Sequence, residues 1–322
     1  MAQARSSCRR CCVRPTMASG KKWVPPATIE ELYASTSGNN FSAINAPTAG
    51  PRKDVPRKVG EASLQLYSLA TPNGWKVGIL LEELGIPYDA HVVNIGLGQQ
   101  FTSGFVGANP NSKIPAAVDR DGPGGKPIAL METCAIMLYL CEKYPEKGFL
   151  PTDPRLRSEC LQWMFWQMAG QGPMTGNYGH FMVYAPPDKC EARDYGVARY
   201  GMEVQRLCDV LDRHLQGYGD FQGNAGLRKE GPRSFLVGEQ YSVADMACLP
   251  WVMTLRGPGY DRPGQPNTKH FIGLDKYKHL SAWADRLSAR LEVQRGMRVC
   301  KDKPKPFEEK GHPLYREPSS RL

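Results

Sequence analysis

Residues 64–85 read LQLYSLATPNGWKVGILLEELG, and three kinds of local pattern follow one another within them. The first residues alternate apolar and polar side chains, which is typical of a short strand. Thr71-Pro72-Asn73-Gly74 interrupts this alternation with residues that favour a turn. Apolar residues then recur over 77–84 at the spacing of one helix face, and Gly85 stands where a C-terminal cap would. The stretch therefore predicts a strand, a turn and a helix.

The chain that follows completes a small α/β domain. We expect a strand over 91–95, two strands over 114–118 and 128–131 joined by a glycine-rich turn, and a helix over 133–144. A strand, a helix and a strand in that order predict parallel pairing through a right-handed crossover. Residues 62–150 are thus predicted to form a thioredoxin-like domain, with a βαβ half, a ββα half and a mixed sheet.

The second half of the chain shows only helical patterns. Amphipathic stretches at 155–170, 192–216, 243–255 and 279–291 predict an all-α domain over 154–300. Ser242 and Asp245 have the spacing of a capping box, in which a serine and an acidic side chain satisfy the free N–H groups at a helix start. We interpret this pair as structural.

The net charge of +9 comes from the ends of the chain. Residues 1–60 carry ten basic and three acidic side chains, and residues 301–322 carry six and four. The body is therefore close to neutral, which argues against nucleic-acid binding because such binding needs a concentrated basic surface. No apolar run is long enough to predict a transmembrane helix.

The flanking segments are predicted to lie outside the two domains. We expect a disordered or targeting leader over 1–40, an arm over 41–61 and a disordered tail over 301–322. The leader is rich in arginine and has no acidic residue before Glu30, so it fits an organelle transit peptide as well as a plain extension with Met17 as an alternative start. A cytoplasmic location is expected, with a mitochondrial or other organellar one as the alternative.

The cysteines and histidines predict neither disulfides nor a metal site. Most of the ten cysteines stand singly in helical patterns and are interpreted as buried free thiols, among them Cys134, Cys141, Cys160, Cys208 and Cys248. The Cys8–Cys11 pair lacks the strand and helix that a redox motif requires. The six histidines are scattered, and none pairs with another ligand at metal-binding spacing.

Three loops of the first domain could bind a ligand together. Thr71-Pro72-Asn73-Gly74 places donors at a helix start, where a thiolate is favoured, although a simple turn with an N-cap explains it too. Ile114-Pro115 could be cis and expose backbone groups to a peptide, or could merely begin an edge strand. Glu132-Thr133 could hold an amino-acid head, or only cap a helix. In chain order the three loops would bind a thiolate, a peptide backbone and an amino-acid head. This order matches the parts of a γ-glutamyl tripeptide.

Over Phe41 to Arg298 the sequence resembles the Nu-class glutathione transferases, a branch that reduces disulfides with glutathione. The resemblance is carried by Ile44-Asn45-Ala46-Pro47, Leu64-Gln65-Leu66-Tyr67-Ser68, Thr71-Pro72-Asn73-Gly74, the run from Ser103 through Asn109-Pro110-Asn111-Ser112-Lys113-Ile114-Pro115, Gly179-His180-Phe181 and Ala244-Asp245-Met246-Ala247. It implies an all-α glutathione transferase domain at the C-terminus, a homodimer, and glutathione as co-substrate without a metal.

The resemblance also implies roles for individual residues. Thr71 and Asn73 would lie near the sulfur, Ile114 on the cysteinyl backbone, and Glu132 with Thr133 on the γ-glutamyl end. Further predicted contacts to glutathione are Asn45, Pro72, Gln100, Lys113, Pro115 and Arg199. The family usually has Glu-Ser where this chain has Glu132-Thr133, and no role is assigned to Gln167. Tyr67 is interpreted as a wall of the domain, and Cys134 as a structural thiol.

The expected activity is reduction of small disulfides, conjugation of electrophiles, or both, with bound glutathione as the thiolate. The alternatives are a non-catalytic binding or regulatory module with this fold, and a nucleic-acid or membrane binder acting through the basic arm. Retention of Thr71, Asn73 and Glu132 argues against the first alternative, and the neutral body argues against the second.

Overall fold

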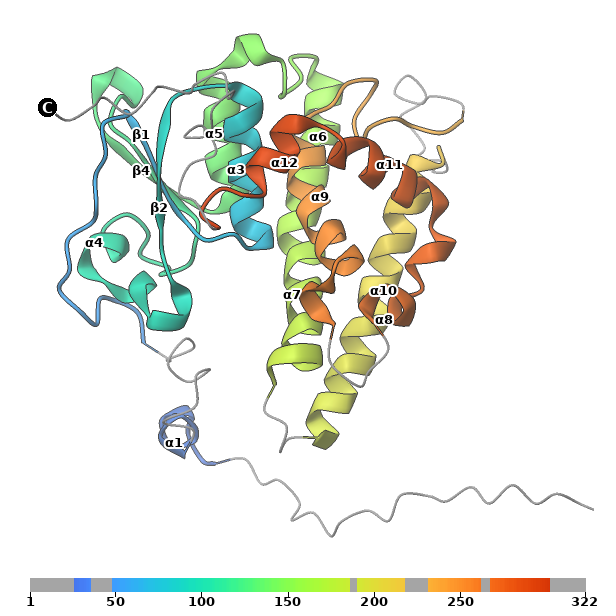
Figure 1. Ribbon diagram of the computed structural model, residues 1–322, viewed down its shortest axis with the longest axis horizontal. Helices are drawn as coiled ribbons and strands as arrows, with labels where there is room; N and C mark the ends of the chain where they lie inside the picture. The colour runs from blue at the N-terminus through green and yellow to red at the C-terminus, as the bar shows by residue number, and fades with distance from the viewer. Residues whose placement is uncertain (1–25, 36–47, 186–189, 218–230, 262–266, 302–322) are drawn as a thin grey trace, which may run out of the picture. The chain divides into compact units, whose positions relative to one another are not determined.

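The computed structural model describes residues 26–35, 48–185, 190–217, 231–261 and 267–301 (Figure 1). By its contacts the chain divides into one unit up to Thr48 and a second from Ala49 onwards. In the first unit, helix α1 (Ile29–Ser35) falls where the sequence predicted no element. The Glu31 N–H donates to the Thr28 hydroxyl, and the Ala27 N–H donates to the Glu31 carboxylate. This reciprocal capping is what the composition-based prediction overlooked.

A four-stranded mixed sheet organises the start of the second unit. Its strands are β1 (Leu64–Ser68), β2 (Tyr88–Val92), β3 (Ala116–Asp119) and β4 (Ile128–Met131), in the spatial order β2-β1-β3-β4. Strand β1 runs parallel to β2 and antiparallel to β3, and β3 runs antiparallel to β4. The predicted thioredoxin-like arrangement is confirmed.

The bounds of two strands differ from the prediction. Strand β2 ends at Val92, because the Asn94 side chain accepts the Leu97 N–H and turns the chain into a 3-10 turn, η1 (Ile95–Leu97). It begins at Tyr88, three residues before the predicted start. Strand β3 begins at Ala116, after the cis peptide bond between Ile114 and Pro115.

Helices cover both faces of the sheet (Figure 1). Leu64, Leu66 and Ala117 belong to the large core that also holds the buried faces of α3 (Pro72–Leu84) and α5 (Thr133–Lys143). On the other face Tyr67, Ala116 and Val118 pack with Phe105 of α4 (Ser103–Val106). All of β1 is therefore buried, although its sequence alternates.

The rest of the unit is helical, as predicted. It contains α6 (Pro154–Trp166), α7 (Gly172–Gly179), α8 (Cys190–Leu215), α9 (Val243–Arg256), α10 (Thr268–Ile272), α11 (Lys278–Ser288) and α12 (Leu291–Gly296). A π-helical turn, η5 (Gln167–Gln171), joins α6 to α7, and a second, η6 (His180–Tyr184), follows α7. Helices α7, α10 and α12 were not predicted, because α7 begins with Gly-Pro and the other two have only five and six residues.

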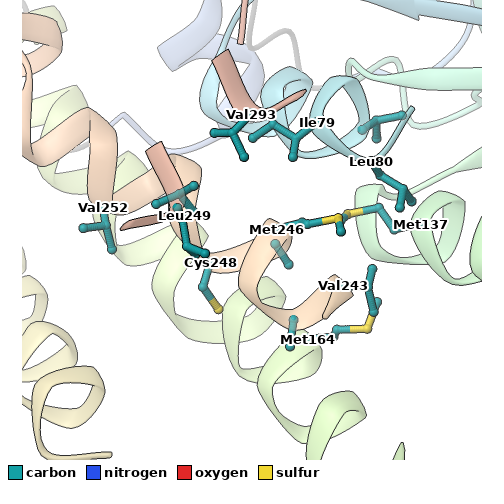
Figure 2. Close-up of a cluster of buried hydrophobic side chains, with 14 of the residues drawn as sticks. Ile79, Leu80, Met137, Met164, Val243, Met246, Cys248, Leu249, Val252 and Val293 are labelled. Atoms are coloured by element: carbon teal, nitrogen blue, oxygen red, sulfur yellow. The ribbon is translucent and has the colours of Figure 1, made fainter. Parts of the chain in front are cut away.

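One hydrophobic core joins the sheet-covering helices to the helical region. Figure 2 shows Ile79 and Leu80 of α3 and Met137 of α5 beside Met246 and Leu249 of α9. Helix α12 packs directly on α3, because a Cβ on Gly78 would lie 2.5 Å from the carbonyl oxygen of Gly296. The Arg290 guanidinium also donates to both carboxylate oxygens of Glu83, at 2.6 and 2.7 Å. These contacts hold the two parts together.

Asp245 confirms the predicted capping role and extends it. Its fully buried carboxylate accepts the backbone N–H groups of Leu236 and Ser242, the Ser242 hydroxyl and the Trp283 indole N–H. One aspartate thus ties the start of α9 to a preceding loop and to α11.

The predicted free thiols are confirmed. Cys141, Cys160, Cys208 and Cys248 are buried, Cys134 is half-buried, and none of them forms a disulfide. Among the helices that the structure describes, none combines the length and the apolar character needed to cross a bilayer.

Candidate functional site

The register of the sheet brings the three predicted ligand loops to one edge. Ala116 at the start of β3 pairs with Tyr67 near the end of β1 and with Met131 at the end of β4. The residues that follow β1, precede β3 and follow β4 therefore lie at the same end of the sheet. These are the turn at 71–74, Ile114-Pro115 and Glu132-Thr133.

Thr71 is the N-cap of α3. Its hydroxyl oxygen accepts the Gly74 N–H at 3.3 Å, and among the described residues the hydroxyl proton has only the Leu69 carbonyl as an acceptor, at 3.5 Å. An acceptor this distant holds the proton weakly, so the hydroxyl can donate to a ligand. A Cβ on Gly74 would lie 1.9 Å from the Leu69 carbonyl oxygen, so this turn requires glycine.

Asn73 and Pro72 complete the first loop. Both are half-buried, and the Asn73 amide forms no hydrogen bond with any residue that the structure describes. The Asn73 backbone N–H, which has no acceptor among the described residues, and the positive end of the α3 dipole lie at this same turn. The loop therefore has a hydroxyl, an amide and a helix start available for an anion.

The second loop is held by a buried asparagine. The Asn109 side chain donates to the Lys113 carbonyl at 2.6 Å and accepts the Asn111 N–H at 2.9 Å. Ile114 is half-buried and precedes the cis peptide bond to a buried Pro115, while the Lys113 side chain points outward and is exposed. Within the described ranges no backbone hydrogen bond engages Ile114, which leaves its peptide groups for a peptide ligand.

The third loop contains a strained residue. Glu132 has φ 64° and ψ 122°, a conformation that costs a non-glycine residue about 1–3 kcal/mol and is often found at functional sites. Its exposed carboxylate accepts a long hydrogen bond from the Asn111 amide at 3.4 Å, so the second and third loops are in contact.

Thr133 is placed differently from what its predicted role suggests. Only 4% of the residue is exposed, and its hydroxyl points inward, 3.1 Å from Lys76 Nζ and 3.0 Å from Met168 Sδ. Thr133 can therefore offer a ligand its backbone N–H at the start of α5 rather than its hydroxyl group. A helix start of this kind favours a carboxylate.

The remaining predicted contacts are less closely grouped. Gln100 is the middle residue of a 3-10 turn, η2 (Gln99–Phe101), and its buried Oε1 has no hydrogen-bond partner in the described part of the chain. Arg199 is exposed on α8 and forms no hydrogen bond or ion pair with the three loops within the described residues. Asn45 lies outside the described residues. The structure thus brings together the three loops, and the contacts of Gln100, Arg199 and Asn45 with the ligand stay predictions.

Tyr67 and Cys134 have structural roles, as interpreted from the sequence. The Tyr67 hydroxyl donates to the Lys58 carbonyl at 2.6 Å, its ring stacks on His91, and burial raises its pKa. Burial likewise raises the pKa of the Cys134 thiol, against the lowering effect of Lys76. The Tyr67 hydroxyl is thus already engaged as a donor, and the raised pKa disfavours a Cys134 thiolate at neutral pH.

Lys76 lies near the site and was not predicted from the sequence. It is 1% exposed, and burial lowers its pKa to about 8. The sequence carried a signal for Lys76, because apolar residues flank it closely in α3 and leave the lysine little chance of reaching solvent.

Among the described residues, no group of three histidine, cysteine or acidic side chains could hold a metal ion.

The structure has a thioredoxin-like sheet, and one edge of this sheet carries a helix start, a cis-proline loop and a second helix start. An all-helical region follows. This combination defines the class of glutathione transferase-fold proteins. Residues 70–143 match the family model for the glutathione S-transferase N-terminal domain. The chain is 40% identical over 271 residues to the disulfide-bond oxidoreductase YghU of Escherichia coli K12, covering 82% of this chain and 84% of that protein.

Two further comparisons agree. The disulfide-bond oxidoreductase YfcG of Escherichia coli K12 is 37% identical over 70% of this chain and 91% of its own. The crystal structure of a Streptococcus pneumoniae glutathione transferase complexed with glutathione is 36% identical with a TM-score of 0.71, covering 87% of this chain and 98% of that one. The chain belongs to the glutathione transferase superfamily.

Proposed function

We propose that this protein is an enzyme that binds glutathione as a thiolate and uses it to reduce disulfides. The observation that carries the proposal is the α3 start, where the Thr71 hydroxyl and the Asn73 amide are both able to donate. Hydrogen bonds to a sulfur anion favour the charged form and lower the thiol pKa. The relatives named as disulfide-bond oxidoreductases support the choice of reaction.

The proposed reaction uses two glutathiones and no protein cysteine. The first thiolate attacks one sulfur of a disulfide, forms a mixed disulfide and releases the other sulfur as a thiolate that takes up a proton. A second glutathione thiolate attacks the glutathione sulfur of the mixed disulfide, giving glutathione disulfide and the second reduced thiol. A Burkholderia graminis relative, 38% identical with a TM-score of 0.65, was crystallised with two glutathiones per subunit; the match covers 74% of this chain and 89% of that one.

The test compares two reactions of the wild-type protein. We expect turnover of hydroxyethyl disulfide with millimolar glutathione to exceed conjugation of chlorodinitrobenzene. No disulfide reduction would reject the reductase, and conjugation alone would favour a transferase. Failure of immobilised glutathione to retain the protein would favour the non-catalytic module.

We also propose that the protein is a homodimer that acts in the cytoplasm. Large apolar side chains remain exposed on the single chain, including Phe165 of α6 at 71% and Met131 of β4 at 41%. Such exposed apolar groups suit a subunit interface. Light scattering that gives the mass of one chain would reject the dimer, and imaging of the tagged full-length protein in an organelle would reject the location.

A further inference from the structure

A buried lysine lies directly behind the third ligand loop. Lys76 occupies the second turn of α3, is 1% exposed and forms no ion pair with a carboxylate among the described residues. A fully buried ammonium without a charged partner is rare, because removing it from water is costly. The proposed reaction does not use this group.

Three acceptors surround the ammonium. Lys76 Nζ lies 3.1 Å from Thr133 Oγ1, 2.5 Å from Gln167 Oε1 and 3.6 Å from Met168 Sδ. An ammonium has three protons to donate, so these contacts can satisfy it. They join three elements, namely α3, the start of α5 and the π-helical turn η5.

The π-helical turn η5 places the Gln167 side chain beside the Lys76 ammonium. This fully buried residue begins η5, and the Gly172 N–H donates to its carbonyl across the turn. A Cβ on Gly172 would lie 2.8 Å from Gln167 Nε2, so a larger residue there would collide with the Gln167 side chain. The Gln171 side chain donates to the Cys248 carbonyl at 3.2 Å and anchors the turn on α9. Single π-helical turns are frequent at functional sites.

We propose that Lys76 is a positioning residue for the γ-glutamyl end of glutathione. By holding the Thr133 hydroxyl it fixes the start of α5, whose free backbone N–H groups face the ligand, and through Gln167 it ties that start to the helical region. The ammonium also adds positive charge behind the point where the ligand carboxylate would bind. The inference rests on the proposed function, since it concerns the same site.

Two ligands and two lysine variants separate this role from a general structural one. Cysteinylglycine lacks the γ-glutamyl group, so its binding affinity should not depend on Lys76. We expect Lys76→Met to weaken glutathione binding about tenfold, as loss of a hydrogen-bonded positioning contact would, and to leave cysteinylglycine binding within about twofold. Lys147→Met removes an exposed lysine and should change neither affinity. Isothermal titration calorimetry on the full-length protein gives all values.

Gln167→Leu provides a second, independent variant. It keeps the charge of Lys76 but removes its acceptor in the helical region, so we expect the same selective loss for glutathione, and it carries the test if Lys76→Met does not fold. Equal losses for both ligands, or no loss for either, would overturn the positioning role. A wild-type protein that binds no glutathione would reject the proposed function as well, whereas wild-type binding with unchanged variants rejects this inference alone.

Discussion

The Thr71 hydroxyl has two roles that substitution can separate. Thr71→Val removes both the N-cap and the donor, so we expect a loss of about 1 kcal/mol in the free energy of unfolding and a fall of about 10- to 100-fold in kcat/KM for disulfide reduction. Thr71→Ser keeps the hydroxyl and should retain most of both. Urea unfolding and steady-state kinetics measure the two effects. A Val variant with unchanged kcat/KM would show that the hydroxyl is only a cap.

Lys76 should give the stability of the protein a distinctive pH dependence. Its pKa falls on folding from 10.5 to about 8, so between these pH values the unfolded chain binds more protons than the native one and the unfolding free energy rises with pH. The cost of burying the charge is therefore fully present below pH 8 and is lost towards pH 10.5. The ionisable groups around the ammonium are Cys134, Cys248 and Glu132, and Lys76→Met retains them all.

The stability difference between Lys76→Met and wild type isolates this effect. We expect the difference, variant minus wild type, to fall by about 3 kcal/mol as the pH rises from 8 to 10.5. Urea unfolding of both proteins across this range measures it. A difference that stays constant with pH would mean that Lys76 keeps an ordinary pKa in the folded protein.

The start of α9 depends on the buried side chain of Asp245. Asp245→Asn places an amide beside four donors, so at least one donor should lose its acceptor. We expect a loss of about 2–4 kcal/mol in the free energy of unfolding. Asp194→Asn, at an exposed position on α8, is the matched control and should leave stability unchanged. A loss in Asp245→Asn no greater than in this control would contradict the buried network.

The elements show where sequence reasoning succeeds and where it does not. Helix α3 and strand β4 lie close to their predicted bounds. The spacing of their apolar residues and the turn-forming residues beside them define both elements in the sequence. The π-helical turns η5 and η6 were not predicted, since an extra residue in a helical turn leaves no periodic signal in a glycine-rich stretch. The inward orientation of the Thr133 hydroxyl could not be predicted from the sequence either, because it depends on Lys76, a partner 57 residues earlier in the chain.

Across the second unit, α3 and α12 meet through two glycines. A Cβ on Gly296 would lie 2.4 Å from the Ile79 backbone, so Gly296→Ala must push α12 away from α3. We expect a loss of about 1–3 kcal/mol, although alanine usually stabilises a helix relative to glycine. At Gly176 a Cβ would meet only the Trp251 ring, at 3.4 Å, so Gly176→Ala is the control and should be neutral or stabilising. Thermal unfolding that ranks the two variants in the opposite order would contradict this packing.

The class of fold of the second unit could be predicted, and with it the grouping of the three loops at one edge of the sheet, because the order and direction of the strands place them there. The continuity of the core between the sheet and the helices could not, since side chains far apart in the sequence form it. That continuity matters for the proposed chemistry, because it gives Lys76 and Gln167 a fixed relation to the start of α5.

The thiol pKa of bound glutathione is the quantity on which the proposed chemistry depends. Ultraviolet absorbance of the thiolate, followed against pH, gives this pKa for the wild type and for the Thr71→Val/Asn73→Ala double variant. We expect the wild type to hold the pKa about one pH unit or more below that of free glutathione, and the double variant to return it towards the free value. A double variant that still binds glutathione with the wild-type pKa would contradict the role of these two donors.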